Sequence, residues 1–241
     1  MQIANYHISP LGENAISIEF GKKINMESHE KVMTLLHVLQ HQPIPWIKDI
    51  IPAYTTLTIV FDAMMVYKLG PTASIHSTVQ EKLKQLLELC NSKIEAPSRK
   101  IEIPVCYDQS FALDMEDMAL HKNLSINEII DLHVSKTYRV YLIGFLPGFP
   151  YMAAVDEKLT TPRLSSPRSN VPAGSVGIAG EQTGIYPLDS PGGWNIIGRT
   201  PLQLFDASKE NPVFLQSGDE VSFKRIGMDE FLHYKPTISW A

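Results

Sequence analysis

Hydrophobic and polar residues alternate in several short segments of the N-terminal part of the chain. Ile16, Ile18 and Phe20 lie two residues apart, and the same period recurs in the segment that ends at Phe61. A period of two places the hydrophobic side chains on one face of a β-strand. The pattern therefore predicts strands over residues 15–20 and 55–61. Further strands are expected near residues 6–9, 47–52 and 101–105.

Two segments between these strands have the spacing of amphipathic helices. Val32, Leu36 and Leu39 are four and three residues apart, and residues 74–90 repeat that spacing. The resulting order is strand, helix, strand, strand, helix, strand, which suggests a ferredoxin-like α+β domain over residues 1–95. A polar segment with Pro97 follows and is the expected linker. Residues 101–106 either complete this first sheet or open the next domain.

Residues 96–241 have a different pattern. Ser125 and Glu128 have the spacing of a capping box, so a helix is expected to begin there. His133 lies on the apolar side of that helix and is interpreted as a packed or partly exposed residue rather than a ligand. A strand is predicted over residues 138–143. From there to Asp206, glycines and prolines recur every few residues, which indicates short strands joined by tight turns.

The motifs of this turn-rich stretch are specific. They read Gly144-Phe-Leu-Pro-Gly-Phe-Pro150, Pro162-Arg-Leu-Ser-Ser-Pro-Arg168, Val171-Pro-Ala-Gly-Ser-Val-Gly-Ile-Ala-Gly180, Gly184-Ile-Tyr-Pro187, Ser190-Pro-Gly-Gly-Trp194 and Gly198-Arg-Thr-Pro201. With Ile51-Pro-Ala-Tyr-Thr-Thr-Leu57 and Ile101-Glu-Ile-Pro-Val-Cys-Tyr107, they closely resemble the family called KipI, PxpB or allophanate hydrolase subunit 1. The resemblance covers essentially the whole chain. It implies that residues 96–241 form a mainly β, cyclophilin-like barrel domain.

Composition narrows the class of protein. The chain has 241 residues, of which 44% are hydrophobic and 20% charged, a mixture able to build a sizeable core. A formal charge of -5 argues against a nucleic-acid partner. We find no secretory signal and no apolar run long enough for a membrane span, and therefore expect a cytoplasmic protein. Cys90 and Cys106 are expected to be reduced and buried thiols.

Familiar catalytic patterns are missing from the turn-rich stretch. Residues 138–206 contain neither histidine nor cysteine, so Ser165, Ser166 and Ser175 have no local base for a nucleophilic triad. The chain has no Walker A loop, and its eight histidines are scattered, so we expect no metal site. The catalytic residues are therefore left unassigned.

The same stretch offers groups suited to binding. Arg163, Arg168 and Arg199 lie in turns, and a guanidinium is a natural partner of a carboxylate or phosphate. The alternative is that each is an exposed loop residue or pairs with a nearby carboxylate of Glu181, Asp189 or Asp156. Aromatic residues are expected either to line a groove or to pack the barrel; they are Phe145, Phe149, Tyr151, Tyr186 and Trp194.

The resemblance implies an activity. Members of the family form a subunit of ATP-dependent 5-oxoprolinase, which converts 5-oxo-L-proline to L-glutamate with two partner subunits, one resembling PxpC or KipA and one called PxpA, of the LamB/YcsF type. ATP is expected to be bound with or by a partner. By position in the family motifs, the residues implied to bind substrate or phosphate are Arg163, Arg168, Gly174, Tyr186, Gly192, Gly193, Trp194 and Arg199. Replacing Arg168 with alanine is expected to abolish activity of the complex without disturbing the fold.

Two other functions remain open. KipI itself is named as an inhibitor of a sensor histidine kinase, which implies a protein-binding role. Related domains also occur in urea carboxylase, as half of a carboxyltransferase. This chain has no biotin-attachment Met-Lys-Met, so it would supply only the acceptor half.

Overall fold

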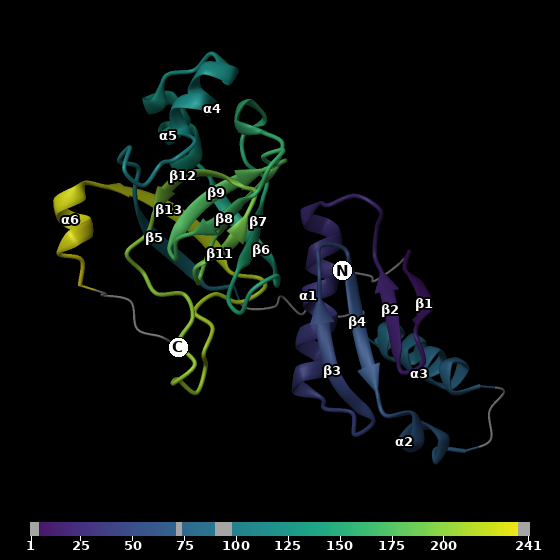
Figure 1. Cartoon of the computed structure of the whole chain (residues 1–241). Coiled ribbons are helices and arrows are strands. Elements are labelled where there is room, and N and C mark those ends of the chain that lie inside the picture. The colour runs from purple at the N-terminus through teal and green to yellow at the C-terminus, as the bar shows by residue number, and fades with distance from the viewer. Residues whose placement is uncertain (1–4, 71–73, 90–97, 236–241) are drawn as a thin grey trace. The chain divides into compact units, whose positions relative to one another are not determined.

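The computed structural model describes residues 5–70, 74–89 and 98–235. The chain divides into two compact units, residues 1–97 and residues 98–241. Figure 1 shows an open sheet with helices in the first unit and a barrel in the second. No helix in the described ranges is long and apolar enough to cross a bilayer. Cys90 lies outside those ranges, whereas Cys106 is a buried free thiol.

The first unit is built on a four-stranded antiparallel sheet with the order β1-β2-β4-β3. Its elements are β1 (His7–Leu11), β2 (Ala15–Glu19), α1 (Met26–His41), β3 (Ile47–Pro52), β4 (Thr56–Phe61), α2 (Ala63–Tyr67) and α3 (Ile75–Leu89). Ile18 pairs with Leu57 across the two central strands, and both side chains are fully buried. The period of two in the sequence therefore marks the inner face of this sheet.

Helices α1 and α3 supply the other side of this core. Val32, Leu35 and Leu83 are fully buried in one cluster with the inward residues of β2 and β4. Asn25 caps α1 by accepting a hydrogen bond from the backbone of Ser28 at 2.8 Å. Figure 1 shows both helices beside the same sheet. The ferredoxin-like assignment is not confirmed, because the strand that follows α3 pairs within the second unit and β1 occupies the outer position beside β2.

The second unit is a closed barrel of seven strands in the order β10-β7-β6-β13-β5-β12-β9. Its elements are β5 (Lys100–Cys106), α4 (Met115–Lys122), α5 (Ile126–Val134), β6 (Thr137–Ile143), β7 (Pro150–Ala153), a 3-10 turn η1 (Glu157–Leu159), β8 (Arg168–Val171), β9 (Ser175–Ala179), β10 (Gln182–Ile185), β11 (Ser190–Gly192), β12 (Asn195–Arg199), β13 (Glu220–Ile226) and α6 (Met228–Leu232). Strands β5 and β13 pair in parallel. The barrel domain expected from the sequence is confirmed.

Closure of the barrel follows from its apolar strands. Ile103, Val140 and Ile197 are fully buried in one large cluster that fills the interior.

Helices α4 and α5 lie together at one end of the barrel in Figure 1. The predicted capping box is present at α5, since Ser125 accepts from the Glu128 backbone while the Glu128 carboxylate accepts from Ser125.

Strands β8 and β11 form a separate two-stranded ribbon beside the barrel. Arg168 pairs with Gly192 in its register, so two residues chosen from the sequence motifs face each other across this ribbon. The ribbon is joined to the barrel by the turn at residues 172–174 and by the segment that leads from Gly193 into β12. This region carries most of the candidate site.

Candidate functional site

Arg168 is held by a buried carboxylate. Its Nη2 donates a hydrogen bond to Oδ1 of Asp114 at 2.6 Å, and the other oxygen of Asp114 accepts the backbone N–H of Ile196, also at 2.6 Å. The Asp114 side chain is 6% exposed and that of Arg168 is 28% exposed. Nη1 of Arg168 is buried and has no hydrogen-bond partner among the described residues. Arg168 therefore ties the ribbon to the start of α4.

This partner differs from the carboxylates considered from the sequence. Asp189 accepts the backbone N–H of Ala173 at 2.7 Å, and Asp156 lies 3.7 Å from the ammonium group of Lys136. Asp114 is 54 residues from Arg168 along the chain, and no local pattern joins them. Asp114 directly precedes α4, but its side chain makes no capping bond there.

The guanidinium groups of Arg163 and Arg168 both lower the pKa of the Tyr186 phenol. Burial raises the pKa of Tyr186, while the backbone N–H of Trp194 and the two guanidinium groups partly oppose this shift. The phenol is therefore protonated at neutral pH and cannot serve as a base there. Arg163 is exposed, so its guanidinium is available to an anion in solution.

The aromatic residues divide into a buried group and an exposed edge. Phe149, Tyr186 and Trp194 are at most 4% exposed and belong to one apolar cluster with Val171. Phe149 meets Trp194 edge to face, with ring centroids 5.3 Å apart. These rings pack the barrel wall. Phe145, in contrast, is 62% exposed at the edge of this group.

Gly192 allows the ribbon to approach this cluster. A side chain at Gly192 would collide with the Tyr186 phenol, and the carbonyl of Gly193 accepts the backbone N–H of Leu164 at 2.8 Å. Close packing against Tyr186 thus explains the glycine at position 192. Gly193 also fixes the loop that carries Arg163.

Arg199 belongs to a different group of contacts. Its Nε donates to the carbonyl of Ala173 at 2.8 Å, and its guanidinium carbon lies 5.7 Å from the centre of the Phe111 ring. It lines a pocket of 370 Å³, which we call the Arg199 pocket. Other lining residues that bear on its chemistry are Gly174, Thr200, Leu202, Gln203 and Phe231. Among the described lining residues, Arg199 carries a positive charge and none carries a carboxylate. The pocket therefore favours an anion.

Gly174 forms one wall of the Arg199 pocket, and the backbone at this position requires glycine. Its φ is +83°, and a Cβ there would lie 2.5 Å from the carbonyl oxygen of Thr200. Its N–H donates to the carbonyl of Tyr186 at 2.7 Å, and its own carbonyl accepts the N–H of Thr200 at 2.9 Å. Two of the residues selected from the sequence motifs, Gly174 and Arg199, therefore lie at the same pocket.

The sequence contains one His-x-x-x-His spacing, typical of zinc sites, that the motif search did not identify. His37 and His41 are four residues apart on α1, and their ring centroids lie 4.0 Å apart. His41 Nδ1 is 2.9 Å from the carbonyl oxygen of His37, and that distance fits a hydrogen bond within the helix. Within the described ranges, no group of three or more histidine, cysteine or acidic side chains is arranged to hold a metal ion.

Comparison with known proteins identifies the class. Residues 6–215 match the family model described as "Carboxyltransferase domain, subdomain C and D". The chain belongs to this family, and within it to the KipI/PxpB group.

Two curated relatives carry the same name, that of the B subunit of 5-oxoprolinase. The chain is 42% identical over 95% of its length to the relative from Bacillus subtilis and covers 97% of that protein. It is 38% identical over 88% of its length to the relative from Escherichia coli O157:H7 and covers 93% of it.

Solved structures share the fold. A conserved uncharacterized protein from Pyrococcus horikoshii is 40% identical, with a TM-score of 0.54, and the chain covers 100% of it while 93% of this chain is matched. The Kluyveromyces lactis urea carboxylase is 19% identical, with a TM-score of 0.68; 94% of this chain covers 22% of that one, and the likeness concerns the fold alone. The same arrangement thus occurs both as a separate chain and as part of a much longer one.

Proposed function

We propose that this chain is the PxpB-type subunit of an ATP-dependent 5-oxoprolinase that converts 5-oxo-L-proline to L-glutamate. One observation carries the proposal: relatives that are 37–42% identical, and that the chain covers almost completely, are named as the B subunit of 5-oxoprolinase. The identity extends through both units, so the proposal concerns the whole chain. We place the complex in the cytoplasm, where ATP is available.

The reaction calls for an anion site. 5-Oxoproline, ATP and two water molecules give glutamate, ADP and phosphate. Transfer of the γ-phosphoryl group to the lactam oxygen activates the carbonyl carbon for attack by one water molecule. The C–N bond then breaks, the nitrogen takes a proton, and the second water molecule releases phosphate from the resulting γ-glutamyl phosphate. The carboxylate of the substrate and the transferred phosphoryl group are both anionic, and guanidinium groups stabilise both.

The Arg199 pocket suits one of these anions. Its volume of 370 Å³ exceeds what a molecule as small as 5-oxoproline needs, and Gln203 adds amide hydrogen-bonding groups beside Arg199. We assign the substrate carboxylate to Arg199 in this proposal. Arg163 is the exposed one of the three arginines selected from the motifs and is available to the phosphate groups of ATP held by a partner. Tyr186, Gly192, Gly193 and Trp194 position the ribbon rather than contact the substrate.

A partner must complete the active site. The described lining of the Arg199 pocket includes neither a carboxylate nor a histidine that could activate water. The proposal therefore assigns the general base and the nucleotide site to the PxpC/KipA-like and PxpA-like subunits. On this view the isolated chain does not hydrolyse 5-oxoproline.

Co-expression tests the assembly step. This chain is purified through an affinity tag together with the two candidate subunits from the same genome, and the stoichiometry of the eluted complex is measured by native mass spectrometry. Stable co-elution of all three supports the proposal. If this chain elutes alone while the other two remain associated, the assignment as a subunit is wrong.

A second function is favoured by the family description. Because the matching model is named for a carboxyltransferase domain, the chain can instead act as the carboxyl-acceptor half of such an enzyme. That function requires a biotin-carrying partner, so transfer of labelled carboxylate from biotin would distinguish it.

The kinase-inhibitor alternative predicts binding to the helical hairpin of a sensor histidine kinase without ATP or 5-oxoproline, which calorimetry measures.

A further inference from the structure

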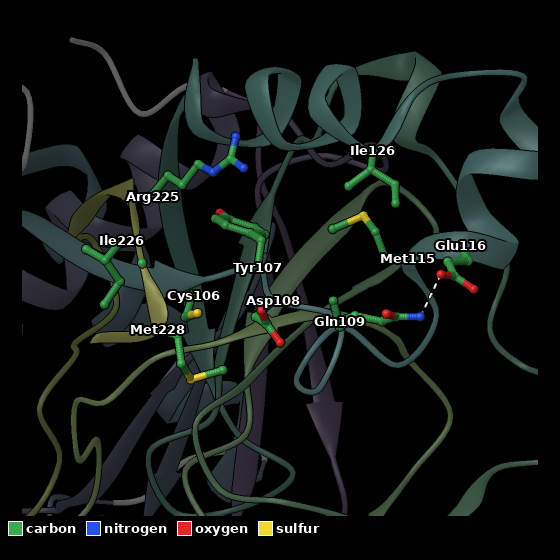
Figure 2. Close-up of a pocket in the computed structure, with 12 residues that line it drawn as sticks. Cys106, Tyr107, Asp108, Gln109, Met115, Glu116, Ile126, Arg225, Ile226 and Met228 are labelled. Atoms are coloured by element: carbon green, nitrogen blue, oxygen red, sulfur yellow. Dashed lines mark hydrogen bonds between the residues drawn. The ribbon is translucent and has the colours of Figure 1, made fainter. Parts of the chain in front are cut away.

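A second pocket in the barrel unit shares no lining residue with the Arg199 pocket. It has a volume of 440 Å³ and lies between the ends of β5 and β13 and the first turns of α4 and α5. We call it the Tyr107 pocket, after the residue drawn near the centre of Figure 2. Its volume is within the range of small-molecule sites. None of the eight residues that the motifs implied for substrate or phosphate binding lines it.

The inner surface of the Tyr107 pocket is apolar. Tyr107 and Met115 are 6% and 2% exposed, and Ile126 closes the rim at 40% exposed. The hydroxyl of Tyr107 is 2.8 Å from Nδ1 of buried His133, so its polar end is already satisfied. Tyr107 therefore presents its ring to the pocket, and the wall suits branched or aromatic side chains.

The charged residues of the pocket lie on different sides. Nη1 of Arg225 donates to Asn127 at 3.1 Å, and the other guanidinium nitrogens have no hydrogen-bond partner among the described residues. Glu116 uses one carboxylate oxygen to accept from Gln109 at 2.7 Å. Figure 2 shows Arg225 on one side of Tyr107 and the Gln109–Glu116 pair on the other, with Met115 and Ile126 between them.

Asp108 adds a second negative charge near Tyr107. One of its oxygens accepts from the backbone and hydroxyl of Ser110, at 3.0 and 2.7 Å. The other oxygen has no hydrogen-bond partner in the described part of the chain, and the same holds for the second oxygen of Glu116. The pocket thus offers the Arg225 cation on one side, the Glu116 carboxylate on the other and an apolar surface between, while Asp108 lies beside Tyr107 (Figure 2).

We infer that the Tyr107 pocket binds a zwitterionic dipeptide with apolar side chains. Arg225 takes the C-terminal carboxylate, Glu116 takes the N-terminal ammonium group, and the side chains lie against Met115 and Ile126. A free α-amino acid carries its ammonium and carboxylate groups on one carbon, so its two charges are closely spaced. A dipeptide separates its charges by a peptide unit and is small enough for 440 Å³.

Calorimetry on the full chain alone tests this inference with leucyl-leucine as the probe. No partner, ATP or 5-oxoproline is present, so the result is independent of the proposed 5-oxoprolinase role. We expect saturable binding of leucyl-leucine, and binding weaker by about tenfold or more for its N-acetyl and C-amide forms, since each loses one charge-assisted contact. Free leucine is expected to bind more weakly than either.

Variants assign each end of the dipeptide. In Arg225→Gln the unmodified dipeptide and its amide should bind equally, and in Glu116→Gln the preference for the free amino group over the acetylated form should fall. Lys224→Gln removes a neighbouring exposed cation outside the pocket and should bind as the parent does. Absence of saturable heat at millimolar dipeptide, or equal binding of all three forms by the parent chain, would overturn the inference.

Discussion

Arg168 and Asp114 form a hydrogen-bonded ion pair that links the β8–β11 ribbon to the start of α4. The two side chains meet at 2.6 Å, and Asp114 is nearly fully buried. Removal of Arg168 leaves a buried carboxylate with one lost partner. The expectation that Arg168→Ala leaves the fold undisturbed is therefore revised.

We predict that Arg168→Ala lowers the free energy of unfolding by about 1–3 kcal/mol. Chemical denaturation followed by tryptophan fluorescence measures this. Arg163→Ala is the control, because Arg163 is exposed and its change should stay within about 0.5 kcal/mol. In a double-mutant cycle with Asp114→Asn, the two changes should be non-additive. Additive effects would show that the pair makes no coupled contribution to stability.

Gly174 and Gly180 distinguish two reasons why a position prefers glycine, a positive φ and a lack of space for a Cβ atom. Both have positive φ, +83° and +59°, but a Cβ at Gly174 meets the Thr200 carbonyl at 2.5 Å, whereas one at Gly180 meets nothing within 4 Å. We expect Gly180→Ala to cost about 1 kcal/mol from backbone strain alone, and Gly174→Ala to cost more because the chain must also shift. Thermal unfolding of the two variants provides the comparison. Equal losses would contradict the packing explanation.

His133 makes stability depend on pH. Burial lowers the pKa of His133 from 6.5 to about 3, so the folded protein keeps this ring neutral. The unfolded chain binds a proton below about pH 6.5, and the contribution to stability, complete above that pH, is therefore lost progressively as the pH falls towards 3. Between pH 7 and 5 we expect a loss of about 2 kcal/mol from this residue.

The comparison of the parent chain with His133→Gln measures this loss. The glutamine side chain has no charge to gain, so unfolding of the variant should depend less on pH over the same interval. His41→Gln is the matched control at an exposed position and should keep the parent's pH dependence. If His133→Gln and the parent respond to pH alike, His133 is not the responsible group.

The hydrogen bonds of His133 assign its tautomer. The Thr183 hydroxyl donates to the carbonyl of Gly177, so its oxygen is left to accept from Nε2 of His133 at 3.1 Å. Nδ1 is then the acceptor, and Tyr107 donates to it at 2.8 Å. A neutral ring satisfies this chain of bonds completely. A protonated ring would have to donate where Tyr107 now donates.

Arg199 is expected to matter for turnover more than for folding. In the assembled complex, Arg199→Ala should raise the KM for 5-oxoproline about tenfold or more, because the pocket loses the cation assigned to the substrate carboxylate. Arg199→Lys should recover part of the loss, since the charge remains but the fork geometry does not. Steady-state kinetics at saturating ATP give these values. An unchanged KM in Arg199→Ala would remove Arg199 from the substrate site.

Local patterns predicted much of the fold. The alternation through Ile16 and Ile18 located β2, the spacing from Val32 to Leu39 located α1, and the Ser125–Glu128 pair located the start of α5. Each of these signals depends on residues close together in the chain. The destination of residues 101–106 was left open because strand pairing depends on distant segments, here β13 and β12.

The candidate site was less predictable for the same reason. The motifs located Gly174 and Arg199, which meet at one pocket. They gave no indication that Arg168 pairs with Asp114, since that contact spans 54 residues. They also did not distinguish buried Tyr186 and Trp194 from exposed Phe145, because an aromatic residue in a turn-rich sequence fits either environment. The Tyr107 pocket combines side chains from five helices and strands, and the motif that ends at Tyr107 gave no indication of it.

The most direct test of the central claim is an omission assay. Glutamate and phosphate released from 5-oxoproline and ATP are measured with this chain and both candidate partners, and then with each of the three left out in turn. The account predicts equal amounts of glutamate and phosphate from the complete mixture and loss of glutamate formation when this chain is omitted. Undiminished glutamate formation by the two partners without this chain would contradict its role as a 5-oxoprolinase subunit.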